Sequence, residues 1–333
     1  MAGLSAALPN ALKAVADAAG SVVERVESVA DSVVESVSQF GRDSVARVIP
    51  PELAAGVAVE ALQEKINELT FELNALRRQD AHVQNVISRL DEEQRLAARL
   101  QQDFLPKKLP QVGAVYFHTL FRPAAYVSGD LYDVMRLDER NVGFYVADAV
   151  GHGMPAALLT MFMKNALVTK DIKAGAYELL EPATTISRLN NSLCQQNLSH
   201  ATFATAVYGR VDTRTLRLRF STGGHPNPVV LRGGQLIELP CNGALLGIFP
   251  DESFDNADVQ LQAGDRVFVY TDGIEVAFAR DGNADPERWK AELLAREDWP
   301  TEKILQDIAN QLDAIDGSLL PKDDLTIVAI EIR

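Results

Sequence analysis

The sequence predicts an α+β domain that follows a long helical region. From about Gly113 onward, short runs rich in Val, Ile, Phe and Tyr are separated by Gly, Pro and Asp turns, which is typical of strands. These runs come in adjacent blocks instead of alternating strictly with helical segments, which favours a layered α+β domain over a doubly wound parallel sheet. Before about residue 105, aromatic residues are almost absent and apolar residues recur at helical spacing.

The overall composition limits the possible functions. The chain has 333 residues, enough for about two domains. Its 32 Lys and Arg against 46 Asp and Glu give a net charge of −14, which argues against nucleic-acid binding and against docking on an anionic membrane by charge. No apolar run reaches the roughly 18 residues of a transmembrane helix. The two cysteines cannot form a disulfide framework or a zinc site, so a cytoplasmic location is expected.

Residues 1–50 form the first predicted segment, an amphipathic helical one. Ser21-Val22-Val23-Glu24 recurs eleven residues later as Ser32-Val33-Val34-Glu35, and valines at helical spacing predict a helix over about residues 20–48. We interpret this helix as facing a protein partner. A helix lying on a lipid surface is the alternative, but the few basic residues do not suit it.

Residues 51–105 form the second predicted segment, a coiled-coil or linker helix. Pro50-Pro51 interrupts the preceding helix, and a longer helix is expected over residues 52–104. A rod of this length cannot be buried by its own domain, so we predict a homodimer through its apolar seam; an intramolecular hairpin with residues 20–48 is the alternative. The seam consists of Leu62, Ile66, Leu69, Leu73 and Leu76, is interrupted at Asp80, and resumes at Val83, Ile87 and Leu90.

Residues 106–333 form the third predicted segment, the α+β domain. The predicted helices are 154–170, 177–197, 286–296 and 301–315. The predicted strands are 114–121, 131–137, 142–148, 201–211, 215–222, 228–231, 235–239, 265–271 and 325–332.

Acidic residues lie at the ends of four of these strands. One Asp-Gly pair alone predicts only a turn. Several carboxylates that converge would repel one another unless a cation neutralised them, and oxygen-only ligands favour Mg²⁺ or Mn²⁺. Two such ions support displacement at phosphorus, so the residues alone indicate a metal-dependent phosphoester hydrolase or a nucleotide-processing enzyme. The residues concerned are Asp130, Asp148, Asp272 and the pair Asp323-Asp324.

Several motifs resemble the bacterial PPM-type (PP2C-like) serine/threonine phosphatases of the SpoIIE/RsbU class. In family order, and covering residues 97–333, they are LQQDFLPKKLP, FRPAAYVSGDLYDV, VADAVGHGMPAALLTMFMK, STGGHPNPVVL, GALLGI, VYTDGIEV and DDLTIVAI. The resemblance implies an α/β/β/α sandwich of two antiparallel sheets flanked by helices. It also implies two Mn²⁺ or Mg²⁺ ions at the ends of the sheets, a metal-activated water as nucleophile, and a phosphoserine or phosphothreonine substrate.

The resemblance also implies roles for individual residues. Asp130 is expected to be a metal ligand, and Asp148 to bridge the two ions, joined by the backbone carbonyl of Ala149. Asp272 and Asp323 are expected to complete the coordination of the first ion. We prefer Asp323 over Asp324 as the ligand, and we expect Asp324 to organise its turn. Gly129 and Gly151 would allow the backbone to approach the ions closely.

Three further residues border these motifs. Many eukaryotic relatives carry a candidate general acid two residues after the bridging Asp, but this chain has Val150 there, so we do not transfer that role to His152. We interpret His225 as structural, fixing a loop through its ring nitrogens. Arg122 is a candidate for holding substrate phosphate, with a surface salt bridge as the equal alternative.

The expected function is dephosphorylation of a small regulatory phosphoprotein in a partner-switching stress response, typically a STAS-type anti-sigma-factor antagonist. An activating protein is expected to bind the N-terminal helices. The alternative is a catalytically silent dimeric scaffold that keeps the phosphatase-like domain for binding. The full set of acidic residues argues against that alternative. A nucleotide cyclase fits the carboxylates but not the motif order, and the chain has no P-loop.

Overall fold

The computed structural model describes residues 51–173, 176–197, 202–278, 286–315 and 323–333. The predicted helix over residues 20–48, and with it the hairpin alternative, lies outside this part of the chain. The chain divides into two compact units, Met1–Ile87 and Ser88–Arg333. We call the second the sheet unit. The last turns of helix α3 (Pro51–Phe104) therefore belong to the sheet unit.

Two five-stranded antiparallel sheets form the centre of the sheet unit. Sheet A has the order β1 (Val115–Arg122), β12 (Leu325–Ile332), β11 (Arg266–Tyr270), β8 (Val229–Arg232) and β9 (Gln235–Glu238). Sheet B has the order β10 (Ala257–Gln260), β7 (Arg217–Gly223), β6 (Ala204–Asp212), β3 (Asn141–Ala149) and β2 (Asp130–Arg136).

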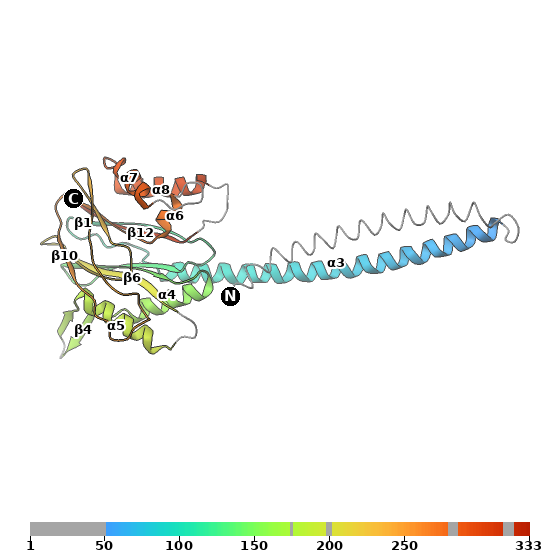
Figure 1. Cartoon of the computed structure of the whole chain (residues 1–333), viewed down its shortest axis with the longest axis horizontal. Helices are drawn as coiled ribbons and strands as arrows, with labels where there is room; N and C mark the ends of the chain where they lie inside the picture. Colours follow the sequence, from blue (N-terminus) through green and yellow to red (C-terminus); the bar gives the residue numbers. More distant parts are fainter. Residues whose placement is uncertain (1–50, 174–175, 198–201, 279–285, 316–322) are drawn as a thin grey trace. The chain divides into compact units, whose positions relative to one another are not determined.

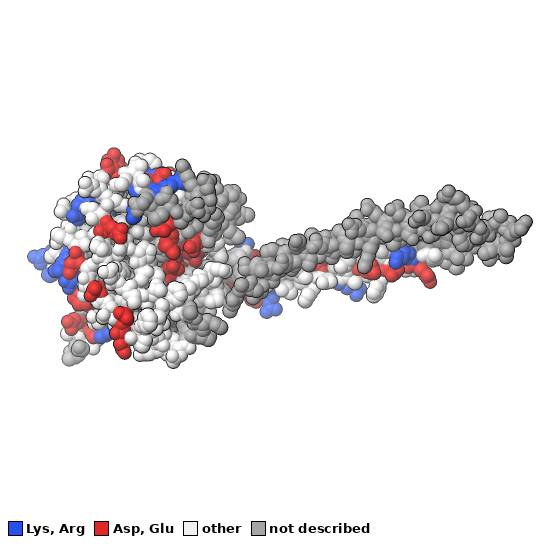
Figure 2. Space-filling view, in the orientation of Figure 1, with Lys and Arg blue, Asp and Glu red and all other residues white. Residues whose placement is uncertain are grey.

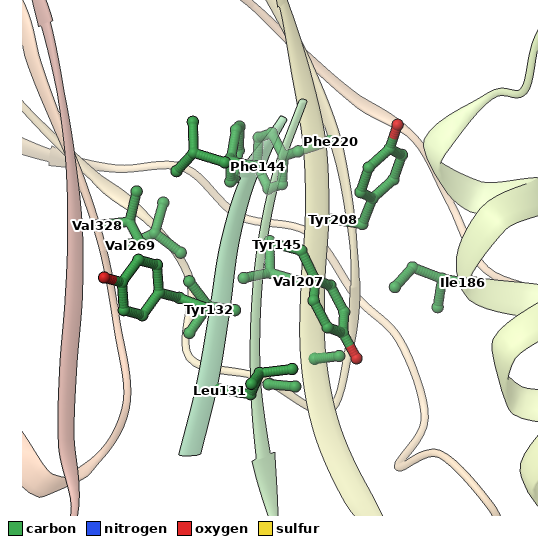
Figure 3. Close-up of a cluster of buried hydrophobic side chains, with 14 of the residues drawn as sticks. Leu131, Tyr132, Phe144, Tyr145, Ile186, Val207, Tyr208, Phe220, Val269 and Val328 are labelled. Carbon is green, nitrogen blue, oxygen red and sulfur yellow. The ribbon is translucent and has the colours of Figure 1, made fainter. Parts of the chain in front are cut away.

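The hydrophobic core fills the space between the sheets and continues beneath the helices. Figure 3 shows Val269 and Val328 of sheet A on one side of the cluster and Tyr208 of β6 facing Ile186 on the other. Gly209 leaves room for the ring of Phe144, because a Cβ at residue 209 would lie 2.4 Å from that ring. Strand β12 is buried along almost its whole length, as expected for a strand covered on both faces.

Helices cover the outer face of each sheet, as Figure 1 shows. Helices α4 (Met154–Ala166) and α5 (Pro182–Gln195) pack on sheet B. Helices α6 (Gly273–Ala277), α7 (Pro286–Leu294) and α8 (Thr301–Ile315) cover sheet A, where Ile304, Leu305 and Ile308 join a second apolar cluster. The layers are helix, sheet, sheet and helix, which confirms the predicted α/β/β/α sandwich. Within the described ranges, no helix combines the length and apolarity that a bilayer span requires.

The structure corrects the sequence predictions around one hairpin. The helices expected over residues 154–170 and 177–197 are shorter, and β4 (Lys170–Lys173) pairs with β5 (Ala176–Leu179) between them. Helix α4 ends because Leu167 adopts an extended conformation, and α5 begins at Pro182, a residue suited to a first helical turn.

Two further elements were not predicted. Strand β10 follows a weak pattern with a single valine, and its alternating exposure shows that only one face is covered. Helix α6 is one short turn directly after the Thr271-Asp272 pair.

Candidate active site

Asp130 and Asp148 lie opposite each other on neighbouring strands. Asp130 opens β2 and pairs in register with Asp148 near the end of β3. Asp130 is 1% exposed, whereas Asp148 is partly exposed. The N–H of Ala149 donates to the carbonyl of Gly129 at 3.1 Å, which continues the pairing past both acids. The fold of sheet B therefore places these two carboxylates side by side.

Asp130 is also tied to sheet A. The hydroxyl of Thr271 donates to Oδ2 of Asp130 at 2.7 Å, and the same hydroxyl accepts the N–H of Thr326 at 2.9 Å. On the other side, the N–H of Asp130 donates to the Ser128 hydroxyl at 3.0 Å. Thr271 thus joins the two sheets at the site. We did not predict this role, and its only signal in the sequence was its position beside Asp272.

Asp272 and Asp323 come from neighbouring turns of sheet A. The N–H of Thr271 donates to the carbonyl of Thr326 at 3.0 Å. A Cβ at Gly273 would lie 1.9 Å from the backbone oxygen of Asp324, so only glycine permits this approach of the two turns. The turns that carry Asp272 and Asp323 are therefore in backbone contact, and both side chains are exposed to solvent.

Asp324 holds the loop that precedes β2. Its Oδ1 accepts the N–H of Ala124 at 2.6 Å, and its Oδ2 accepts the N–H of Gly129 at 2.6 Å. The side chain of Asp323 accepts the N–H of Asp324, at 2.9 Å, and makes no such long-range hydrogen bond to the other described residues. This leaves Asp323 the more available ligand of the pair. We call Asp130, Asp148, Asp272 and Asp323 the carboxylate centre.

The carboxylates affect one another electrostatically. Burial raises the pKa of Asp148 to about 7, reinforced by the negative charges of Asp272, Asp323 and Asp324. Burial, together with the charge of Asp148, also raises the pKa of Asp130 well above its usual range. The pKa of Asp323 is also raised, mainly because the surrounding protein removes part of the water around its carboxyl group, and the charges of Asp272 and Asp324 add to this effect. Asp148 of sheet B therefore lies near enough to Asp272 and Asp323 of sheet A for their charges to interact.

The donor set fits a hard divalent cation. In the described part of the chain, no three His, Cys, Asp or Glu side chains are already arranged to hold an ion. Neighbouring negative charges nevertheless help to raise the pKa of Asp130, Asp148 and Asp323, and positive charge between them would remove that penalty. Carboxylate oxygens with no His or Cys ligand match Mg²⁺ or Mn²⁺.

The turn after β3 packs tightly on the loop before β2. A Cβ at Gly129 would lie 3.3 Å from the carbonyl oxygens of both Ala149 and Gly151 and 3.2 Å from Ala156. Gly151 has a φ of 93°, a conformation that favours glycine. This packing keeps the Ala149 carbonyl, the predicted backbone ligand, beside the start of β2.

The remaining candidates lie around the centre. His225 is buried, its Nδ1 is 2.8 Å from the Thr205 hydroxyl, and burial lowers its pKa to about 3, so the ring is neutral and links its loop to β6. His152 is exposed, and it lies near enough to Asp323 to favour the charged form of the Asp323 carboxyl group. Arg122 donates from Nη1 to the carbonyl of Ala309 in α8 at 3.2 Å, so this donor is held by the fold and is not directed at the carboxylate centre.

The sequence is similar to a known protein family and to individual members of it. Residues 138–333 match the family described as Stage II sporulation protein E (SpoIIE). The phosphoserine phosphatase RsbU of Bacillus subtilis is 23% identical over 323 residues, covering 92% of this chain and 93% of the relative. The phosphoserine phosphatase RsbP of the same organism is 28% identical over 187 residues, covering 55% of this chain but 45% of the relative.

Solved structures show the same fold. The SiaA-PP2C domain of Pseudomonas aeruginosa aligns with a TM-score of 0.63 and 23% identity, covering 74% of this chain and 99% of that domain. The PP2C phosphatase domain of SpoIIE from Bacillus subtilis, with a fragment of its regulatory domain, aligns with a TM-score of 0.52 and 20% identity, covering 66% of this chain and 61% of that structure.

Proposed function

The chain belongs to the SpoIIE family of PP2C-type phosphatases, and from this premise we propose that its carboxylate centre hydrolyses phosphoserine or phosphothreonine on a protein substrate. The family agrees with the one that the sequence motifs indicated. The observation that carries the proposal is the position of Asp148, which pairs in register with the buried Asp130 of sheet B. Burial and the negative charges of Asp272, Asp323 and Asp324 on the sheet A side raise its pKa to about 7. This grouping of carboxylates is electrostatically unfavourable without bound cations, and it is useful to an enzyme that binds cations.

We propose that the protein holds two Mn²⁺ or Mg²⁺ ions through Asp130, Asp148, Asp272, Asp323 and the Ala149 carbonyl. Bound there, the ions would make water more acidic and offset the charge that develops on the phosphoryl oxygens. The chain itself supplies the positioning. Thr271 fixes Asp130 through its hydroxyl, and the pairing of β2 with β3 fixes Asp148 relative to Asp130.

The surface charge is consistent with a protein substrate brought in by specific contacts. Figure 2 shows acidic side chains spread over the drawn face of the sheet unit, with basic side chains mostly toward its left and upper edges. Together with the net charge of −14, this argues against a nucleic-acid substrate. The similarity to the phosphoserine phosphatase RsbU over almost the whole length of both chains supports a phosphoserine substrate. We propose a small STAS-type regulatory phosphoprotein, the substrate that the family resemblance of the motifs implies.

The activity is tested with a generic aryl phosphate. The wild-type protein should hydrolyse it with Mn²⁺ and lose the activity in EDTA, while Asp148→Asn and Asp272→Asn should lose most of the Mn²⁺-dependent activity. Asp255→Asn, which removes an exposed carboxylate outside the centre, is the matched control and should behave as wild type. Equal rates for the wild type, Asp148→Asn and Asp272→Asn would refute catalysis by this centre and leave the scaffold alternative.

We also propose that α3 pairs with α3 of a second copy. The seam residues Ile66, Leu73, Leu76, Val83 and Leu90 are all exposed, and a row of apolar side chains at heptad spacing is stabilised by a partner helix. Sedimentation velocity should show a dimer that Leu73→Lys dissociates. Asn74→Lys, which puts the same charge on an exposed residue outside the seam, should leave the dimer intact. A concentration-independent wild-type monomer would contradict the pairing.

The end of α3 offers a route by which a partner could regulate the site. Nε2 of Gln101 donates to the carbonyl of Ser128 at 2.7 Å, and Oε1 accepts the N–H of Ser128 at 2.9 Å. Asp91 of α3 accepts a hydrogen bond from the hydroxyl of Tyr126 in the same loop. Because Asp324 holds the other side of this loop, we propose that a protein bound to residues 1–105 changes activity through it. Equal activity of the full chain and of a chain beginning at Ser88, with and without such a partner, would contradict this.

A further inference from the structure

A groove lies between the end of α5 and the loop of residues 247–251. Its volume is about 770 Å³. The walls combine amide and apolar side chains, among them Asn191, Gln195, Phe203 and Ile248. We call it the docking groove. The activity proposed above does not use it.

The loop that forms one wall of the docking groove is held rigidly. Asn190 is fully buried; its Nδ2 donates to the carbonyl of Phe249 at 2.8 Å, and its Oδ1 accepts the N–H of Gly247 at 2.9 Å. The next residue, Asn191, accepts the N–H of Asp251 at 2.9 Å. Two consecutive side chains of α5 therefore fix the backbone of the loop at three points.

This fixed loop presents large apolar side chains to solvent. Ile248 is 43% exposed and Phe249 is 60% exposed. A flexible loop could turn such side chains inward, but the hydrogen bonds to Asn190 and Asn191 hold the backbone that carries them. Rigidly held, exposed apolar side chains beside a groove are typical of a binding surface.

The wall of the docking groove is linked to the carboxylate centre through the backbone. The carbonyl of Phe203, in the groove wall, accepts the N–H of Val150 at 3.0 Å, and Val150 is two residues after Asp148. Thr205, two residues after Phe203, pairs in register with Asp148. At about 3.3 Å per extended residue, the groove wall begins within roughly 10 Å of the centre, which is about three residues of extended peptide.

We propose that the docking groove binds the segment of the phosphoprotein substrate next to its phosphorylated residue, with a large apolar side chain about three or four residues away seated against Ile248 of the groove wall and the exposed Phe249 that follows it. This inference rests on the proposed function. The exposed amide side chain of Gln195 suits the backbone of an extended peptide, because it can both donate and accept hydrogen bonds. A peptide whose phosphoserine reacts at the centre would reach the groove wall within about three extended residues.

The test uses the full chain and a set of short phosphoserine peptides in an alanine background, in which a single leucine occupies each position in turn. For the wild type, a leucine about three or four residues from the phosphoserine should lower KM at least about fivefold relative to the peptide without leucine, because it adds buried apolar surface. The double variant Ile248→Ser/Phe249→Ser should lose this gain, and its hydrolysis of a small aryl phosphate should stay within about twofold of wild type.

The matched control is Ile172→Ser in the β4–β5 hairpin, which removes another exposed apolar side chain and should keep the leucine preference. A leucine preference at no position, or one that survives in the double variant, would overturn the inference. Binding of the same labelled peptides to Asp272→Asn protein, followed by fluorescence anisotropy, separates docking from catalysis. Selective binding without any aryl phosphate hydrolysis by the wild type would refute the proposed function and leave the docking groove standing, whereas unselective binding would refute the groove.

Discussion

The two sheets contribute to the carboxylate centre in different ways. On sheet B, Asp130 is buried, paired in register with Asp148, and held by hydrogen bonds from Thr271 and to Ser128. On sheet A, Asp272 and Asp323 stand exposed on two turns that touch through their backbones. The sheet B side is set by strand pairing, whereas the sheet A side depends on close packing of turns. Variants on the two sides should therefore differ in what they lose.

The largest expected effect is on catalysis and compares Asp148→Asn with Asp323→Asn. Asp148 has the carboxylates of both sheets around it, so its loss should lower aryl phosphate hydrolysis about 10²–10³-fold. Asp323 lies at the exposed edge, so its loss should cost about 10-fold. Steady-state rates over a range of Mn²⁺ concentrations measure both. Equal losses for the two variants would show that the two sides do not differ in this way.

The next effect is on stability and tests the packing of the sheet A turns. Gly273→Ala places a Cβ 1.9 Å from the backbone oxygen of Asp324, so it should lower the free energy of unfolding by about 3 kcal/mol and reduce metal affinity. Gly264→Ala is the control, because Gly264 has a φ of 91° but a Cβ added there would meet no atom within 4 Å. It should cost about 1 kcal/mol and leave hydrolysis unchanged. Similar losses for both variants would contradict a special contact at Gly273.

A third effect is on the pH dependence of stability without metal. Burial and neighbouring charges raise the pKa of Asp148 to about 7 from an unfolded value of 3.8, so the folded state keeps a proton that the unfolded chain releases between these values. The free energy of unfolding should therefore fall as the pH rises from about 4 to about 7, and Asp148→Asn should escape this loss. In EDTA, the stability advantage of the variant should grow by about 2–3 kcal/mol over that range. Urea unfolding of both proteins measures this difference, and a constant difference at all pH values would contradict the electrostatic account.

The smallest effect concerns the loop before β2. Gln101→Ala removes both hydrogen bonds to Ser128 and should cost about 1–2 kcal/mol of stability, with a rise in the Mn²⁺ concentration needed for activity. Gln102→Ala, at the exposed neighbouring position of α3, should change neither. An unchanged metal requirement in Gln101→Ala would show that this loop does not position Asp130.

The elements best predicted from sequence are those whose pattern is local. Strand β12 was predicted with its observed ends because apolar β-formers fill residues 325–332 between an acidic turn and the end of the chain. Strands β4 and β5 were missed because residues 170–179 continue a helix-like pattern, and only their pairing with each other makes them extended.

The same difference between local and long-range signals applies to the candidate site. Acidic residues at strand ends could be recognised from sequence, since each borders a turn. The residues that fix these acids could not be recognised from sequence. Their hydrogen bonds to Asp130, or to the loop before β2, form only once the two sheets and the end of α3 are in place. These residues are Thr271, Ser128 and Gln101. Likewise, the separate tasks of Asp323 and Asp324 depend on hydrogen bonds to residues about 200 positions away in sequence.

Direct titration of Mn²⁺ into the metal-free full chain, followed by calorimetry, tests the central claim most directly. If carboxylates of both sheets hold the ions together, the wild type should bind Mn²⁺, and Asp148→Asn and Asp272→Asn should each weaken binding at least about tenfold, whereas Asp255→Asn should not. Undiminished binding by the two centre variants, or no binding by the wild type, would contradict a shared metal centre at the ends of the two sheets.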